Sequence, residues 1–481
     1  MNYILEGHSY RNDVQTMIQV FYPNESYGQL DAPEQAGSEP VVLSRMQIAE
    51  GLCVAAVFES GRIVAEKSQP ILYGNEKEYK RLVKLTIYEC LTERTGIRPP
   101  WGLLTGIRPS KMVHELWRQG LDDEGAKRAL MADCLILPEK AELAAAVARA
   151  EGAVFAGSEE DSVALYIGIP FCPTRCQYCS FAAYPLEGYQ NRVESYLDTL
   201  LKELAFLVPY TKGRRLESVY IGGGTPTALA EGQVERLLSG LAGLYDLSQV
   251  AEFSVEAGRP DTITREKLRL LRRYGVHRIS INPQTMHQQT LDRIGRRHTV
   301  EEFISAYELA RDEGFDHINI DLILGLPEET PDHVAATMER LVALSPAAVT
   351  VHTLAVKRAS ALKEGLSQIN LTDADTMEKM LAIAASACEN MGLRPYYMYR
   401  QKNSSGNFEN VGYARPEYTG IYNVQIMAER QTILAAGAGA ITKICLPHEN
   451  RVERVPNVKN IDEYCSRIDE MLERKRKGVI L

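Results

Sequence analysis

From about residue 163 the sequence alternates short apolar segments with amphipathic ones, and this alternation constrains the fold more than any other feature. The amphipathic segments repeat apolar residues at helical spacing, so the pattern predicts an α/β fold built on a parallel sheet. Six such units predict an open, partial (β/α)6 barrel with its site at the C-terminal ends of the strands. The predicted strands are 163–169, 218–221, 251–256, 278–282, 317–324 and 348–354, and the predicted helices are 191–208, 231–245, 264–274, 300–313 and 332–344.

Three cysteines, spaced Cys172-x3-Cys176-x2-Cys179, follow the first predicted strand directly. Three thiolates on one tight loop can hold three irons of a [4Fe–4S] cluster and leave the fourth iron open. The amino and carboxylate groups of S-adenosylmethionine (SAM) can chelate that open iron. The cysteine loop therefore predicts a cluster at the end of the first strand.

Two other interpretations of these cysteines are a structural zinc site and a disulfide. A structural zinc site would need four ligands, usually in two pairs, and no second pair lies nearby. A disulfide would suit a secreted protein, and the chain has no secretory features. The cluster is the favoured interpretation.

A glycine turn, Gly222-Gly223-Gly224-Thr225, follows the second predicted strand. Glycines let the backbone approach a ligand closely. A nucleotide phosphate loop is the alternative, but no Gly-Lys-Ser/Thr follows, so it is disfavoured. Beside the cysteine loop, the turn fits the segment that receives the amino acid end of SAM.

Polar residues stand at or near the ends of the other strands. Glu256 ends the third strand and Asp321 lies within the fifth, and either could accept hydrogen bonds from ribose hydroxyls; both could instead be capping or solvated acids. Gln284 follows the fourth strand, and beyond it Arg296 could pair with the SAM carboxylate. Tyr166, on the first strand, could bind SAM or pack against the cluster, or it could belong to the core.

The pattern divides the chain into three regions. Residues 1–155 are expected to form an N-terminal accessory domain, 156–360 the barrel, and 361–481 an α/β region that covers the substrate. In the first region, 52–58 and 62–66 predict a hairpin, and 76–91 predicts a helix.

A short repeat stands out in the N-terminal region: Thr-Gly-Ile-Arg-Pro occurs at 95–99 and again at 105–109. Its two arginines could grip carboxylates from stiff turns. Two similar turns that cap helices explain the repeat equally well, so no site is assigned there.

The overall composition narrows the class of protein. At 481 residues, 45% hydrophobic and 24% charged, the chain is long enough for two or three globular domains, and a net charge of −9 argues against nucleic-acid binding. The N-terminus does not resemble a signal peptide, and no apolar run reaches the roughly 18 residues of a membrane span. Six further cysteines are expected to be buried thiols in a reducing, cytoplasmic compartment: Cys53, Cys90, Cys134, Cys388, Cys445 and Cys465.

Several segments together resemble the oxygen-independent coproporphyrinogen III oxidase group of radical-SAM proteins. The long N-terminal region, with Pro-Trp-Gly-Leu-Leu-Thr-Gly-Ile-Arg-Pro at 100–109, is similar to its HemZ branch, also called coproporphyrinogen dehydrogenase. The barrel segments that carry the resemblance are Tyr-Ile-Gly-Ile-Pro-Phe-Cys at 166–172, Tyr-Ile-Gly-Gly-Gly-Thr-Pro-Thr at 220–227, Phe-Ser-Val-Glu at 253–256, Ser-Ile-Asn-Pro-Gln-Thr at 280–285 and Asn-Ile-Asp-Leu-Ile-Leu-Gly-Leu-Pro at 319–327.

The resemblance implies roles for particular residues. Cys172, Cys176 and Cys179 would bind the [4Fe–4S] cluster. The positions expected to contact SAM are Tyr166, Gly223, Gly224, Thr225, Glu256, Gln284, Arg296 and Asp321.

Two residues depart from the main oxidase type. Phe181 stands where that type has a further cysteine, and Gly168 stands where it has histidine. The Cys-x-Phe ending instead resembles the haem-chaperone and haem-degrading branches. Whether a second SAM binds is left open.

The resemblance implies that the chain is an enzyme of anaerobic haem biosynthesis. Two propionates of coproporphyrinogen III would be decarboxylated oxidatively to give protoporphyrinogen IX, with electrons from a low-potential donor such as flavodoxin or ferredoxin. A haem chaperone and a radical haem-degrading methyltransferase are the alternatives. The predicted partners for the substrate carboxylates are four cations after the sixth strand and in the C-terminal region: Lys357, Arg358, Arg400 and Lys402.

Overall fold

The computed structural model describes residues 1–23, 25–106, 108–181, 183–355, 372–400, 408–446 and 451–479. The chain divides into two compact units, Met1–Ala146 with Tyr399–Glu409, and Val147–Met398 with Asn410–Leu481. The division into three regions at 155 and 360 stays a prediction from the sequence.

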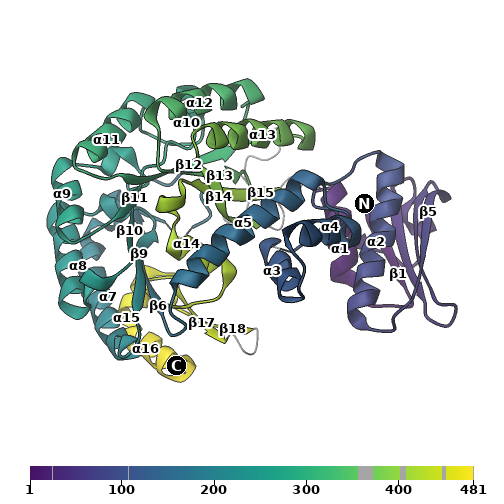
Figure 1. The fold of residues 1–481 in the computed structure, drawn as a ribbon, viewed down its shortest axis with the longest axis horizontal. Helices are drawn as coiled ribbons and strands as arrows, with labels where there is room; N and C mark the ends of the chain where they lie inside the picture. Colours follow the sequence, from purple (N-terminus) through teal and green to yellow (C-terminus); the bar gives the residue numbers. More distant parts are fainter. Residues whose placement is uncertain are drawn as a thin grey trace. The chain divides into compact units, whose positions relative to one another are not determined.

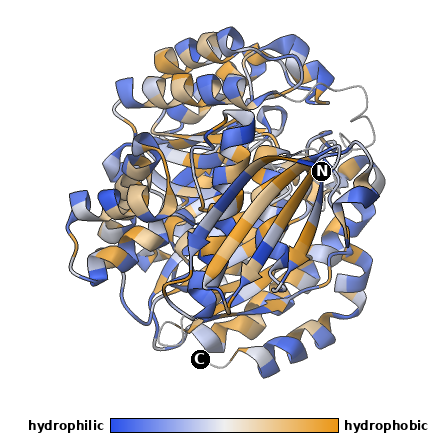
Figure 2. Ribbon diagram, turned by 90° about the vertical axis from the view of Figure 1, so that its right-hand side faces the viewer, coloured by the Kyte–Doolittle hydropathy of each residue, from blue (hydrophilic) through white to orange (hydrophobic). Residues whose placement is uncertain are grey.

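The first unit contains a five-stranded sheet in the order β2-β1-β3-β4-β5. The predicted hairpin is confirmed, because β4 and β5 pair in antiparallel register. β4 is apolar from Leu52 to Phe58, and Figure 2 shows stretches of hydrophobic residues along the strands of this sheet. Val57 and Ala56, which point to opposite faces of the sheet, belong to two different clusters of buried residues. The elements of the unit are β1 (Asn2–Glu6), α1 (Arg11–Phe21), β2 (Gly28–Gln29), β3 (Val41–Gln47), β4 (Leu52–Glu59), β5 (Arg62–Pro70), α2 (Glu76–Thr95), α3 (Ser110–Arg118) and α4 (Asp123–Cys134), followed by α5 (Pro138–Gly157), which runs on into the second unit.

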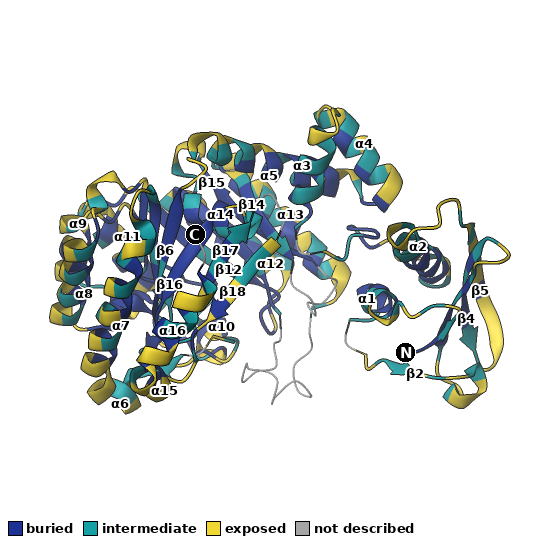
Figure 3. Ribbon diagram, turned by 90° about the horizontal axis from the view of Figure 1, so that it is seen from below, coloured by how far each residue is buried: buried dark blue, intermediate teal, exposed yellow. Residues whose placement is uncertain are grey.

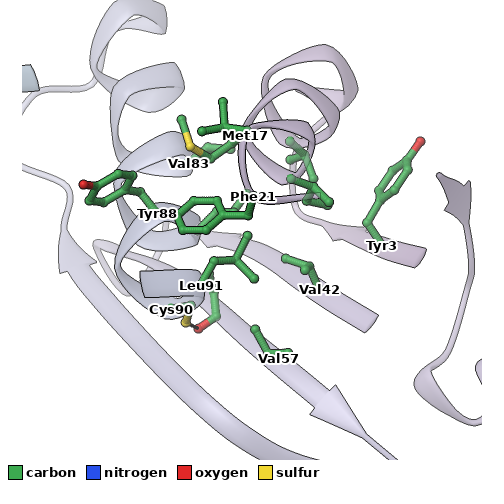
Figure 4. Close-up of a cluster of buried hydrophobic side chains, with 14 of the residues drawn as sticks. Tyr3, Met17, Phe21, Val42, Val57, Val83, Tyr88, Cys90 and Leu91 are labelled. Carbon is green, nitrogen blue, oxygen red and sulfur yellow. Dashed lines mark hydrogen bonds between the residues drawn. The ribbon is translucent and has the colours of Figure 1, made fainter. Parts of the chain in front are cut away.

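The core of the first unit lies between its sheet and the helices α1 and α2. Figure 4 shows Phe21 of α1 beside Tyr88 and Leu91 of α2, above Val42 and Val57 of the sheet. All five side chains are buried, and removing this apolar surface from water stabilises the layer arrangement. The predicted helix 76–91 is confirmed as α2.

The second unit is built on a sheet of eleven strands, and the six predicted strands form its centre in chain order, all parallel. β13 does not pair with β6, so the partial barrel stays open among the described residues. Figure 1 shows the helices α7, α8, α9, α11 and α12 outside these strands. The strands are β6 (Val163–Ile169), β9 (Leu216–Gly223), β10 (Glu252–Glu256), β11 (Arg278–Ser280), β12 (His317–Leu324) and β13 (Ala348–Thr353).

The helices around the barrel begin at the caps that their sequences provide. Thr264, Thr299 and Thr330 each accept a hydrogen bond from a backbone N–H of the first turn that follows. In Figure 3 the strands are dark blue and the outer helix faces are largely yellow, which is the amphipathic pattern of the sequence. The helices are α6 (Leu186–Tyr189), α7 (Val193–Leu207), α8 (Glu231–Leu244), α9 (Arg265–Arg273), α10 (Gln288–Arg293), α11 (Val300–Asp312), α12 (Pro331–Leu344) and α13 (Ala374–Asn390).

The last part of the chain extends the sheet at both edges. β15 pairs antiparallel with β13, and β16 pairs in parallel with β6, with β17 and β18 beyond it. The elements are β14 (Arg394–Arg400), β15 (Glu409–Ala414), α14 (Ile421–Ala428), β16 (Thr432–Ala436), β17 (Ile441–Leu446), β18 (Arg451–Pro456), α15 (Ile461–Ser466) and α16 (Ile468–Gly478); a small separate sheet joins β7 (Phe171–Cys172) to β8 (Tyr184–Pro185).

The structure also bears on membrane-spanning helices and on the burial of the cysteines outside the motif. None of the helices in the described ranges is both long and apolar enough to cross a membrane. Of the six cysteines outside the motif, four are buried as expected, but Cys445 and Cys465 are partly exposed. Cys445 lies near the end of β17, whose last two residues are only partly buried, and Cys465 lies on α15, where Ile461 and Tyr464 are the buried positions.

Candidate active site

The three cysteines of the motif lie on a loop that follows the C-terminal end of β6. The base of the loop is closed by the parallel pairing of β7 with β8 and by a hydrogen bond from Tyr184 N to Pro170 O at 2.8 Å. Cys179 N donates to Cys176 O at 3.1 Å, which folds the tip into a turn. Cys176 is buried, while Cys172 and Cys179 are partly exposed.

The surroundings of these thiols disfavour a bare thiolate. Burial raises the pKa of the Cys172 thiol to about 11 and also raises the pKa of Cys179. A bound metal would therefore be what stabilises their deprotonated forms. Among the described residues, no three His, Cys, Asp or Glu side chains are arranged to chelate one metal ion. An iron–sulfur cluster does not require that arrangement, because each of its thiolates binds a different iron.

Gly224 lies directly against the cysteine loop. Its N–H donates to Ile169 O at 2.7 Å, and Thr225 N donates to Phe171 O at 2.7 Å. A Cβ atom at position 224 would lie 2.6 Å from Phe171 O and 3.0 Å from Cys172 Sγ, so a larger residue would displace the loop. The close approach expected of this turn is therefore present.

Glu256 projects from the end of β10 toward the same turn. Its Oε1 accepts a hydrogen bond from the Tyr220 hydroxyl at 2.7 Å, and its Oε2 accepts one from Gly223 N at 3.1 Å. Burial raises the pKa of the Glu256 carboxyl to about 7, against these hydrogen bonds, which lower it. The carboxylate is thus held in one orientation and poised to accept a proton near neutrality.

Asp321 is fixed by two asparagines, Asn319 of its own strand β12 and Asn282 just after β11. Asn282 Nδ2 lies 2.8 Å from its Oδ2, and Asn319 Nδ2 lies 2.7 Å from its Oδ1. His352 Nε2 lies 3.9 Å from Oδ2. Burial acts to raise the pKa of Asp321, but the contacts with His352 and Asn319 outweigh it and leave the pKa below its ordinary value.

Gln284 has an unusual backbone and an unsatisfied side chain. Its φ of 71° lies in the left-handed region, which a non-glycine residue adopts only under constraint. The constraint is visible, since Gln284 N donates to Asp321 O at 3.1 Å and its carbonyl accepts from Ile323 N at 3.0 Å. Its Oε1 is buried and accepts no hydrogen bond from any described residue. A buried acceptor of this kind is satisfied when a ligand brings a donor.

Arg296 reaches from beyond α10 to the cysteine loop. Its Nη1 lies 4.0 Å from Cys176 Sγ, and its Nη2 donates to Gly258 O at 3.0 Å and to Asn282 O. The side chain is buried, and its Nε has no partner in the described part of the chain. The guanidinium of Arg296 therefore lies beside the Cys176 thiol, and its Nε–H donor is unpaired among the described residues.

Tyr166 belongs to a stack of three tyrosine rings inside the barrel. Its ring centroid lies 6.2 Å from that of Tyr220 and 6.3 Å from that of Tyr422, and the last two centroids are 4.4 Å apart. Burial raises the pKa of Tyr166, so the phenol stays protonated. The hydroxyl lies 3.4 Å from the position that a Cβ of Gly223 would occupy.

These residues fit the cofactors that the motif suggests. The cysteine loop is contacted by the glycine turn at Gly224 and by the guanidinium of Arg296, and Gln284 follows the neighbouring strand β11 with a buried, unpaired acceptor. Such a set suits a cluster with an adjoining ligand that carries amino, carboxylate and hydroxyl groups.

Sequence reasoning missed four residues of this region: Arg259, Tyr220, His352 and Tyr422. Arg259, three residues after Glu256, and His352, near the end of the sixth strand, occupy positions where barrel sites collect. That position could have singled them out. Tyr422 lies on α14, far along the chain, and no local pattern marks it.

Of the cations considered as carboxylate partners, Lys357, Arg358 and Lys402 lie outside the described residues. Arg400 is not a solvated surface charge. Its side chain is buried in the first unit, donates to the carbonyls of Leu104 and Gly106, and lies over the ring of Trp101. Burial lowers the pKa of Arg400 to about 10.

Comparison with known proteins agrees with this geometry. Residues 166–341 match the radical SAM superfamily. The chain is 39% identical over 406 residues to the oxygen-independent coproporphyrinogen-III oxidase-like protein HemZ of Bacillus subtilis, covering 83% of this chain and 81% of that one. It is 33% identical over 234 residues to the heme chaperone HemW of Bacillus subtilis, covering 48% of this chain and 61% of that one.

A solved structure supports the fold. The coproporphyrinogen III oxidase HemN of Escherichia coli, a radical SAM enzyme, aligns with a TM-score of 0.53 at 24% identity, over 68% of this chain and 73% of that one. The predicted α/β fold with a partial radical-SAM barrel is confirmed, as is the expectation of a [4Fe–4S] cluster and SAM, which the superfamily uses. The chain belongs to the HemZ-type, oxygen-independent coproporphyrinogen-III oxidase-like family of radical-SAM proteins.

Proposed function

We propose that this protein decarboxylates two propionate side chains of coproporphyrinogen III to vinyl groups, giving protoporphyrinogen IX. Each propionate loses carbon dioxide, one hydrogen atom and one electron. The observation that carries the proposal is the buried Arg296 beside the cysteine loop, with its Nη1 4.0 Å from Cys176 Sγ and its Nε unpaired among the described residues, in a chain of this family. When bound, the cluster and SAM supply a 5′-deoxyadenosyl radical that removes the hydrogen atom.

In this proposal each side chain of the site has one task. Cys172, Cys176 and Cys179 hold the cluster. SAM would be held by the glycine turn and by Glu256 and Asp321, whose carboxylates can accept hydrogen bonds from its hydroxyl groups. The SAM-binding positions are Tyr166, Gly223, Gly224, Thr225, Glu256, Gln284, Arg296 and Asp321.

The remainder of the barrel mouth has to exclude water and hold an anionic substrate. A primary carbon radical abstracts hydrogen from any nearby donor, so a shielded pocket is a chemical requirement. Lys357, Arg358 and Lys402 are proposed as partners for substrate carboxylates. The electron enters from a low-potential donor such as flavodoxin or ferredoxin, and the compartment is proposed to be the cytoplasm.

The test is an anaerobic assay of reconstituted, reduced protein with SAM and coproporphyrinogen III, followed by chromatography of the porphyrins. A three-carboxylate intermediate should appear before protoporphyrinogen IX, with deoxyadenosine and carbon dioxide. Cys176→Ala, which removes one proposed cluster ligand, is the matched control and should give none of these products.

A second function, haem chaperone, is favoured by two observations. The chain resembles HemW, and Phe181, 66% exposed on the cysteine loop, replaces the additional cysteine of the oxidase type. A chaperone would retain haem and show no substrate-dependent cleavage of SAM. Haem retained without decarboxylation in a fully reconstituted sample would reverse the order of the two proposals, and consumption of haem with SAM would instead indicate the haem-degrading methyltransferase.

A further inference from the structure

Arg259, on the turn after β10, is a buried cation aimed at the cysteine loop. We propose that it is a positioning residue for the cluster: it fixes the loop through Thr174 and raises the reduction potential of the cluster through Cys176. The proposal rests on the proposed function only in assigning Cys176 to the cluster. It concerns the electronic setting of that cluster and is independent of which porphyrin the protein uses.

The contacts of Arg259 define its direction. The Nη1 atom lies 3.0 Å from Thr174 Oγ1 and 3.8 Å from Cys176 Sγ. On its other side, Nε lies 2.9 Å from Asp261 Oδ1 and Nη2 lies 2.8 Å from Oδ2. The residue is 3% exposed. This two-point contact with Asp261 holds the guanidinium plane so that its remaining edge faces the loop.

A second arginine meets the same sulfur. Arg296 Nη1 lies 4.0 Å from Cys176 Sγ, and its Nη2 donates to the carbonyl of Gly258, the residue before Arg259. The turn after β10 therefore connects the two cations. Cys172 has a different neighbour, because its Sγ accepts from the neutral hydroxyl of Thr225 at 3.5 Å. Arg259 and Arg296 thus both lie within 4.0 Å of Cys176 Sγ.

Electrostatics gives the sign of the effect. Reduction adds one negative charge to the cluster, and nearby cations and N–H donors to its sulfurs stabilise that charge. Because the guanidinium of Arg259 is buried, water screens this attraction weakly. Asp261 acts in the opposite sense, since its carboxylate partly offsets the charge of Arg259. Loss of Arg259 should lower the reduction potential, and loss of the Asp261 charge should raise it.

The test is the midpoint potential of the reconstituted cluster, measured without porphyrinogen by redox titration monitored by electron paramagnetic resonance. Arg259→Gln should shift the potential to more negative values and Asp261→Asn to more positive values. Arg259→Lys, which keeps the charge but loses the planar fork, should shift it less than Arg259→Gln. The matched control is Arg269→Gln, an exposed arginine that pairs with Glu313 and should leave the potential unchanged.

Iron and sulfide content must be equal across the variants, so that the potentials refer to the same cluster. If Arg259→Gln does not retain a cluster, the other two variants test the proposal. Asp261→Asn should then shift the potential to more positive values and Arg259→Lys to more negative values. Shifts in the same direction for the Gln and Asn variants, equal shifts for Gln and Lys, or no shift at all would overturn the proposal. A failed porphyrin assay with these shifts present would reject the proposed function alone.

Discussion

Lys475 Nζ and Glu203 Oε1 lie 2.7 Å apart, and neither side chain has any exposed surface. Lys475 also donates to Asn457 Oδ1 at 2.6 Å, while Glu203 Oε2 accepts from Gly437 N at 2.8 Å and from the Tyr464 hydroxyl. The network ties α16 to α7 and to the turn after β16. This buried, hydrogen-bonded charge pair holds the turn after β16 against the barrel helix α7.

Lys475→Met should destabilise the protein by about 3–5 kcal/mol, because it leaves the carboxylate of Glu203 buried without its cation. Urea unfolding followed by circular dichroism measures the change. The matched control is Lys477→Met, an exposed lysine paired with Glu473, which should stay within about 0.5 kcal/mol of the parent. Equal effects of the two substitutions would contradict a special role for the buried pair.

The raised pKa of Glu256 predicts a pH-dependent stability of the ligand-free protein. Because the folded-state pKa is raised from 4.5 to about 7, the stabilisation is fully present below 4.5 and is lost as pH rises through about 7. The unfolding free energy of the parent minus that of Glu256→Gln should therefore fall between about pH 5 and about pH 8.

Glu313→Gln is the matched control for that experiment. Arg269 and Arg265 hold the pKa of the Glu313 carboxyl below 4.5, so its contribution is lost only at still lower pH. The corresponding difference should stay flat over the same range. A difference for Glu256→Gln that is flat or rises with pH would show that the carboxyl is already ionised in the folded chain.

Glu256→Ala should weaken SAM binding while the cluster is retained. Loss of a hydrogen bond from a sugar hydroxyl to a charged acceptor costs about 1.5–3 kcal/mol, or roughly ten- to a hundredfold in affinity. Isothermal titration calorimetry under anaerobic conditions measures the affinity, and the iron content checks the cluster. Unchanged affinity would reassign Glu256 to a structural role beside Tyr220.

Gly224→Ala should reduce the iron content of the reconstituted protein. The added methyl group would lie 2.6 Å from Phe171 O and 3.0 Å from Cys172 Sγ, so the cysteine loop must move. Gly232→Ala, in α8, places its methyl group where no atom lies within 4 Å and should keep the parent's iron content. A fully loaded Gly224→Ala protein with parental SAM affinity would mean that the loop adapts at little cost.

Each of Cys172→Ala, Cys176→Ala and Cys179→Ala should abolish the oxygen-sensitive absorption of the cluster, since each removes the thiolate of one iron. Cys445→Ala and Cys465→Ala are the controls, because both cysteines are partly exposed but lie outside the motif, and these variants should keep the spectrum. Stoichiometric zinc in place of iron, in protein purified without air, would contradict the cluster assignment.

The central strands could be predicted closely because they depend on local patterns. β6 and β12 have the predicted bounds, and β9 differs by only a few residues. The fourth strand ends earlier than expected, at Ser280. Beyond it Pro283 cannot donate a ladder hydrogen bond, and Gln284 turns into a left-handed conformation that a strand does not contain.

By itself, the sequence determined the barrel, the cysteine loop and the glycine turn, because hydrophobic period and ligand spacing are properties of neighbouring residues. Only the tertiary structure decided that Tyr422 stacks on Tyr220, that Arg259 faces Cys176, and that β16 pairs with β6 at one edge of the barrel. These contacts join residues that are distant along the chain. They depend on how distant segments pack together in the folded unit, and a pattern of neighbouring residues does not contain that information.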